Sequence, residues 1–194
     1  MLFALLIFLS TGQDARALLN RAVEAFRSGR VEQSVADFDR VARLAPEDAP
    51  YLWQRGIAQF EAGKYRECRD MFISHRAVNP DDVENAAWHF LCVARAESPE
   101  AARKQILPVG PDARVPMREV YEMFRGRMTQ AQVLKAAGSD PSAQFFARLY
   151  IGLYLEATGD PAAGRAQIEI AAEDRYAQAG GYMHDVARVH LQRK

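Results

Sequence analysis

A spacing of 34 residues relates two stretches in the first half of the chain, and it constrains the fold more than any other sequence feature. The identical pairs at this spacing are Leu18/Leu52, Arg21/Arg55, Phe26/Phe60, Gly29/Gly63, Phe38/Phe72, Pro46/Pro80 and Asp48/Asp82. A repeat of this period is typical of short helical units that bury their apolar face only by stacking on a neighbour.

Each unit has the pattern of a helix, a turn and a second helix. In both units apolar residues recur at helical spacing, a short break containing glycine follows, and a second amphipathic stretch ends at proline. In the second unit the small residues Gly56 and Cys68 are expected to let the two helices approach closely. Gly63 is expected to turn the chain, and Phe72 to fill the gap to the next helix.

This order of small residues, glycine, aromatic residue and proline resembles the tetratricopeptide repeat (TPR). The resemblance implies an all-α fold, a right-handed α-α superhelix of helix pairs in one domain over residues 18–194. Its expected parts are TPR units at about 15–48 and 49–82, a degenerate unit at 83–107, a divergent helical insertion at 108–141, a TPR unit at 144–175 and a C-terminal capping helix at 179–192. Within the middle, separate helices are expected at 83–97, 98–107, 115–127 and 129–137.

The order of these parts also resembles the bacterial TPR adaptor family around the lipoprotein NlpI. The similar stretches are residues 55–58, with the string RGIA, and residues 79–95, NPDDVENAAWHFLCVAR. This resemblance implies a non-catalytic scaffold that faces the periplasm and docks cell-envelope enzymes such as proteases and peptidoglycan hydrolases. No cysteine lies near the end of the N-terminal apolar run, so no lipid anchor is expected.

In TPR domains, defined positions of the first helix of each unit line the concave face and bind a peptide or protein. Carried over to this sequence, the partner-binding residues are Arg16, Leu19, Val23, Phe26, Arg27, Trp53, Ile57, Phe60, Glu61, Glu84, Leu91 and Arg95. Aromatic residues flanked by arginines are typical interaction anchors. The alternative is that the N-terminal apolar helix or the central insertion covers this face, which would make Trp53 and Phe60 part of the core.

Residues 1–17 have the outline of a short secretory signal peptide. An apolar run from Leu2 to Leu9 precedes a small polar patch and the Ala15-Arg16-Ala17 end. The sequence therefore predicts export to the periplasm or the cell exterior. The alternatives are an uncleaved apolar helix that packs on the domain, and a cytoplasmic protein.

The charges and cysteines argue against several classes of function. The 25 basic and 25 acidic side chains give no net charge, so nucleic acid is not expected as a partner. Cys68 and Cys92 lie among apolar neighbours and are interpreted as buried free thiols, with a disulfide as the alternative in an oxidising compartment. No phosphate loop or catalytic triad order is present, so neither catalysis nor a cofactor is expected. Both a monomer and a homodimer are compatible with the sequence.

Histidines support a second hypothesis, a metal-binding or metal-dependent hydrolase module. His75, Glu84 and His89 are its candidate ligands, since two histidines and a carboxylate are a common set for a divalent metal. The competing interpretation is that His75 is hydrogen-bonded to a carboxylate of the nearby turn. His184 and His190, on the terminal helix, are expected to face solvent.

Two arginines, Arg21 and Arg55, stand where the repeat usually has leucine. We expect them to pair with an acidic residue on a neighbouring helix, such as Asp37 or Glu84, rather than with a ligand.

Overall fold

The computed structural model describes residues 2–193, and of the side chains those from Asp14 onward. Within this part of the chain there are twelve α-helices, two short 3-10 helices and no strand. The predicted all-α fold is therefore confirmed. Met1 and the side chains of residues 1–13, which belong to the predicted signal segment, lie outside this description.

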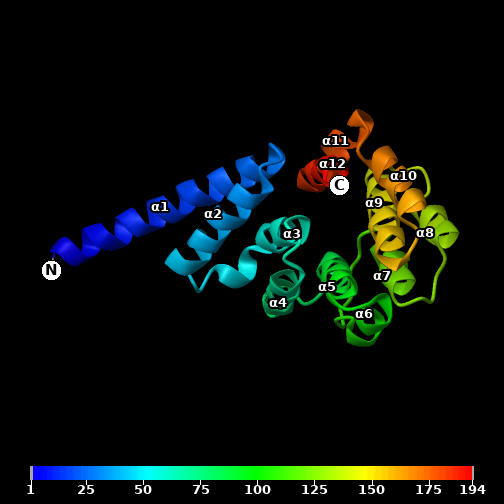
Figure 1. Cartoon of the computed structure of the whole chain (residues 1–194), viewed down its shortest axis with the longest axis horizontal. Helices are drawn as coiled ribbons and strands as arrows, with labels where there is room; N and C mark the ends of the chain where they lie inside the picture. The colour runs from blue at the N-terminus through cyan, green and yellow to red at the C-terminus, as the bar shows by residue number, and fades with distance from the viewer. Residues whose placement is uncertain (1, 194) are drawn as a thin grey trace.

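The first half consists of helices joined by short turns. Their bounds are α1 (Leu2–Arg27), α2 (Val31–Leu44), the 3-10 helix η1 (Ala49–Tyr51), α3 (Trp53–Glu61), α4 (Tyr65–Arg76) and α5 (Val83–Ala96). Gly29 and Gly63 both turn the chain with φ +74°, a left-handed conformation that glycine adopts without steric cost. Figure 1 shows these helices following one another side by side from the N-terminus towards the middle of the molecule.

The middle section has shorter helices than the amphipathic patterns predict. They are α6 (Pro99–Gln105), α7 (Met117–Phe124) and α8 (Gln130–Ala137). Thr129 starts α8 with a capping box, in which its side chain accepts from the Gln132 backbone and the Gln132 side chain accepts from the Thr129 backbone. The predicted helix over 115–127 is confirmed only in its centre, because the chain on both sides of α7 forms turns.

Helices α9 (Pro141–Thr158) and α10 (Pro161–Ala171) pack against each other. The Asp160 side chain caps α10 by accepting from the Ala163 backbone at 3.1 Å, with Pro161 in the first turn as predicted. A Cβ added to Gly164 would lie 2.6 Å from the Gly152 carbonyl oxygen. The two glycines are therefore what allows the helix backbones to touch.

The C-terminal segment is divided by a glycine. After the 3-10 helix η2 (Asp174–Tyr176), the short α11 (Ala177–Gly180) stops at Gly181, whose φ is +53°, and α12 (Tyr182–Gln192) follows. The single capping helix predicted from residue 179 is thus two helices. In Figure 1, α12 returns to the C-terminal end of α1, and the two helices are in contact.

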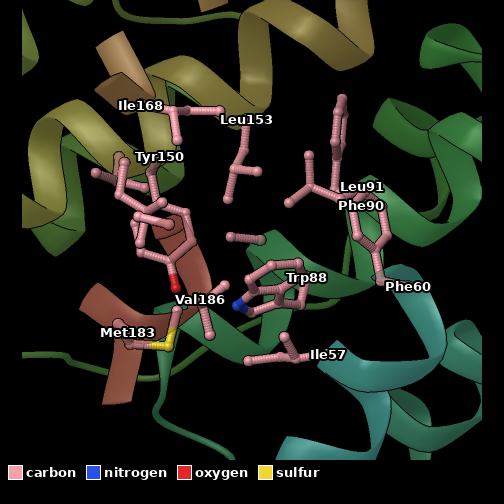
Figure 2. Packing of buried hydrophobic residues seen from close by; sticks show 14 of the residues in the cluster. Ile57, Phe60, Trp88, Phe90, Leu91, Tyr150, Leu153, Ile168, Met183 and Val186 are labelled. Carbon is pink, nitrogen blue, oxygen red and sulfur yellow. The ribbon is translucent and has the colours of Figure 1, made fainter. Parts of the chain in front are cut away.

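One continuous apolar core runs through the molecule from α1 to α12. Figure 2 shows its centre, where Trp88 of α5 lies between Ile57 of α3 on one side and Tyr150, Met183 and Val186 on the other. Trp88, Tyr150 and Ile57 are each exposed by 1% or less. The terminal helix α12 therefore contributes side chains to this core.

The two repeated arginines form ion pairs with neighbouring helices, as predicted. Arg21 donates to both Asp37 carboxylate oxygens, at 2.7 and 2.5 Å, and joins α1 to α2. Arg55 pairs with Asp39, at 2.7 Å, rather than with Asp37 or Glu84. Both pairs span 16 residues along the sequence.

Cys68 of α4 and Cys92 of α5 are joined by a disulfide, with their Cα atoms 5.8 Å apart. The interpretation of both residues as free thiols is therefore wrong. Sequence reasoning favoured thiols because a buried cysteine among apolar residues looks the same whether or not it has a partner. Both side chains are fully buried.

Replacing Cys68 and Cys92 with alanine is expected to lower the free energy of unfolding by about 2–4 kcal/mol, because the bond closes a loop in the unfolded chain. The loop spans a sequence separation of 24 residues. Urea denaturation of the wild-type and double-alanine proteins measures the loss. Alkylation of the denatured wild-type protein is the control: iodoacetamide should label neither cysteine before reduction and both after it.

Across the described residues, no helix combines the length and the apolar character needed to span a membrane. Helix α1 is continuous from Leu2 to Arg27, and Figure 1 shows its first turns extending beyond α2.

Candidate functional site

Five of the predicted partner-binding residues contact the terminal helix α12, and together they form the α12 docking surface. These residues are Phe26, Arg27, Trp53, Phe60 and Glu61. They come from α1 and α3, whereas α12 follows more than a hundred residues later in the chain. The face that the sequence assigns to a partner is thus occupied by another segment of the same chain.

Tyr182 fixes the first turn of α12 on this surface. Its ring stacks on Phe26 with centroids 5.6 Å apart and meets the edge of Trp53 at 5.3 Å. The Arg27 guanidinium lies 5.8 Å from the same ring and donates to Asp185 at 2.9 Å. One aromatic side chain therefore contacts three predicted anchors at once.

His190 fixes the last turn of α12 through two carboxylates. Its Nδ1 lies 2.9 Å from Glu61 Oε1 on α3, and its Nε2 lies 2.8 Å from Glu156 Oε2 on α9. Burial alone lowers the pKa of His190, but the two carboxylates outweigh it and raise the pKa to about 10. The imidazolium therefore joins three helices.

The raised pKa of His190 predicts a pH-dependent stability. The stabilisation is complete below the ordinary histidine pKa of 6.5 and is lost as pH rises towards the folded-state value of about 10. Urea denaturation is expected to give a lower free energy of unfolding at about pH 9 than at about pH 6. His190→Gln is the control, since its stability should change less over this range. If the free energy of unfolding changed equally with pH in both proteins, the raised pKa could not be assigned to His190.

A cavity of about 220 Å³ lies next to the α12 docking surface. Its lining comes from α3, α4, α5, α12 and the segments before α5 and α7, and consists of Trp53, Phe72, His75, Asn79, Asp82, Glu84, Asn85, Trp88, Arg114 and Met183. Aromatic rings form one part of the wall and a set of charged and polar groups forms the rest. Met183 is the lining residue that α12 contributes.

Arg114 binds the carboxylates at this cavity. It donates to Glu84 at 2.6 Å, to Asp82 at 2.5 Å and to Asp112 at 2.6 Å. The Tyr150 hydroxyl donates to the other Glu84 oxygen at 2.5 Å. Burial, together with the nearby Asp82, raises the pKa of Glu84 above its ordinary value, although the hydrogen bonds from Tyr150 and Arg114 act in the opposite direction.

The other predicted site residues are distributed over the core and the surface. Ile57 and Leu91 are fully buried, and Leu19 and Val23 are partly buried against the core. Arg16 is exposed, and Arg95 donates to the Tyr65 hydroxyl at 3.1 Å. Glu84 belongs to the cavity described above. The twelve predicted residues therefore do not form one open binding face.

The prediction that His184 and His190 face solvent is wrong. His184 is 3% exposed and its Nε2 lies 3.1 Å from the Ala172 carbonyl oxygen. For His190 the sequence does indicate burial. Tyr182, Val186 and His190 recur at i, i+4, i+8 and therefore share one helix face. A histidine on an apolar face is expected to have a buried partner.

Two of the three proposed metal ligands, His75 and Glu84, line the same cavity, but His89 does not. His75 Nδ1 donates to the Pro50 carbonyl oxygen at 2.8 Å, and the Asn79 amide, itself bonded to Asp82, lies 3.4 Å from its Nε2. His89 is buried elsewhere, and burial lowers its pKa to about 4. From Asp14 to Arg193, no group of three or more His, Cys, Asp or Glu side chains has a geometry that could hold a metal ion.

Comparison with known proteins gives no family assignment. No protein-family model matches the chain, and no curated protein is found to be similar to it.

Proposed function

We propose that this protein is a non-catalytic scaffold of TPR-type helix pairs that binds a helical segment of a protein partner. Its partner-binding surface is the α12 docking surface, which α12 itself covers in the unbound protein. The arrangement corresponds to an adaptor of the NlpI type, with a right-handed superhelix whose inner face carries the binding residues.

The observation that carries this proposal is the agreement between the predicted binding residues and the α12 contacts. Of the twelve residues that the resemblance to the TPR places on the concave face, five contact α12, namely Phe26, Arg27, Trp53, Phe60 and Glu61. A surface that holds one amphipathic helix with aromatic and ionic contacts has the chemistry to hold another of similar pattern.

We also place the protein in an oxidising compartment, the periplasm or the cell exterior. The Cys68–Cys92 disulfide supports this location, because such bonds persist outside the reducing cytosol. The apolar pattern of residues 2–9 supports it independently as the core of a signal peptide.

A labelled peptide with the sequence of residues 181–193 tests the binding surface. The full-length Tyr182→Ala variant has a weakened α12, so it is expected to bind the peptide more tightly than the wild type, whose own helix competes at high effective concentration. Adding Trp53→Ala or Arg27→Glu to that variant should abolish binding. Fluorescence anisotropy measures both effects.

Tyr51→Ala provides the matched control, because Tyr51 is 58% exposed and lies outside the docking surface. It should leave peptide binding unchanged. Binding that does not depend on Trp53, or that is absent from every variant, would contradict the proposal. If the peptide binds as expected, crosslinking during affinity purification of the Tyr182→Ala variant would identify the natural partner.

A further inference from the structure

The chain bends at a single glycine before it enters α12. Gly181 stands between α11 and α12 with φ +53° and ψ −128°. Residues with a side chain rarely adopt this conformation, whereas glycine adopts it without steric cost. Among the described residues, no atom beyond its chain neighbours would lie within 4 Å of a Cβ added to Gly181. Glycine is therefore needed here for the bend of the backbone and not for a close contact.

The preceding glycine has a different role, because it holds α11 in place. A Cβ added to Gly180 would lie 2.7 Å from the Phe145 ring of α9. Helices α11 and α9 are in contact at this close approach. The chain is thus anchored up to Gly180, and the bend at Gly181 sets the direction of α12.

A helical conformation at Gly181 would join α11 and α12 into one continuous helix. The Gly181 N–H already bonds to the Ala177 carbonyl oxygen at 3.1 Å, as it would in such a helix. Residues 177–192 contain no proline, so every residue of the segment can be helical. Within the described chain, α12 begins without a side-chain cap. A continuous helix would give its first N–H groups carbonyl partners in α11.

Helix α12 brings three charged side chains against the rest of the molecule, and each meets residues of opposite charge. The pairs are Asp185 with Arg27, His190 with Glu61 and Glu156, and Arg193 with Glu32. These partners lie on α1, α2, α3 and α9, all before the bend. The α12 of a second copy carries the same charges at the same spacing, so it can form every one of these pairs.

We propose that α12 is exchanged between two copies of this chain, with Gly181 as the hinge. In the exchanged dimer α11 and α12 form one helix, and the α12 of each copy occupies the α12 docking surface of the other. The contacts of α12 are the same in both forms, so the balance depends on the hinge and on protein concentration. The inference does not depend on the proposed function, since a foreign helix or peptide binds that surface without any exchange.

Gly181→Ala is expected to convert the monomer into a dimer, because alanine is strained in the bent form and favours the continuous helix. Light scattering during size-exclusion chromatography should show twice the mass of the monomer. Gly138→Ala is the matched control, since Gly138 has φ +57° and ψ −134° and alanine meets the same strain there. Pro141 at the start of α9 prevents a continuous helix, so this variant should stay monomeric.

A crosslink between two variants identifies α12 as the exchanged segment. Arg27 Nε lies 2.9 Å from Asp185 Oδ2. An Arg27→Cys protein and an Asp185→Cys protein are mixed at high concentration and treated with a short bismaleimide, and each protein alone serves as the control. Neither chain carries both substitutions, so only exchange brings the two new thiols together. The mixture should give a crosslinked dimer, in several-fold higher yield when both proteins also carry Gly181→Ala.

The proposal would be overturned by a Gly181→Ala variant that stays monomeric, or by one whose dimer lacks this crosslink. Equal dimerisation of Gly138→Ala would also overturn it, because the hinge would then have no special role. If Gly181→Ala does not fold, the mixture with the natural glycine decides the question, and absence of the crosslink there contradicts the exchange.

Discussion

Replacing His190 with alanine is expected to lower the free energy of unfolding by about 3–5 kcal/mol, because it leaves one buried and one partly buried carboxylate without their cation. The side chains of Glu61 and Glu156 are 3% and 18% exposed, so water replaces little of the lost interaction. The two anions also face the same space once the imidazolium is removed. Urea denaturation followed by circular dichroism measures the change.

A set of neutral variants separates the charge effect from lost packing. Adding Glu61→Gln and Glu156→Gln to His190→Ala removes the unpaired charges, so this triple variant should recover most of the lost stability. If the single and triple variants were equally unstable, packing against Phe60 would account for the whole effect. Hydrogen exchange on α12 amides should show that the loss begins with release of this helix.

The helix pairs could be predicted because their determinants are close in sequence. The repeat pattern predicts a close approach of two helices at Gly56, and a Cβ added to Gly56 would lie 2.7 Å from the Phe72 ring of the second helix. Periodicity likewise located α5 and the start of α10. Each of these features depends on contacts between adjacent helices, which a local pattern encodes.

The position of α12 could not be predicted in the same way. The contact between Glu61 and His190 joins residues 129 apart, so it depends on the accumulated curvature of all the helices between them. A terminal amphipathic helix has the same pattern whether it covers the end of a row of helices or packs against their side. The sequence thus predicted residues of the docking surface, but not that α12 contacts them.

The central insertion was one of the two expected alternative occupants of that surface, and its helices pack elsewhere. Helix α7 packs against α5, α8 and α9 instead. Arg114, just before α7, is held by Asp82, Glu84 and Asp112 at the cavity rim. The insertion therefore shapes the cavity and leaves the docking surface to α12.

The second large effect on stability is expected from truncation of Trp88, which contrasts with truncation of Trp53. Trp88→Ala is expected to lower the free energy of unfolding by about 3–5 kcal/mol, as for other buried aromatic truncations. Trp88 is 1% exposed, and its ring lies 5.4 Å from Phe60 and 6.3 Å from Phe72, measured between centroids. Truncation enlarges a cavity that is already present, so the neighbouring rings lose contacts on two sides.

Trp53→Ala is the matched comparison, because Trp53 is only partly buried and its ring edge contacts Tyr182. Its cost to stability should be clearly smaller, and the main effect should be faster hydrogen exchange in α12. Trp88→Phe keeps an aromatic ring between Phe60 and Phe72 and should retain most of the stability. Urea denaturation of the three variants measures these changes. If Trp53→Ala and Trp88→Ala lowered the free energy of unfolding equally, α12 docking and core packing would form one cooperative unit. The proposed binding mechanism requires instead that α12 can be released while the core stays folded.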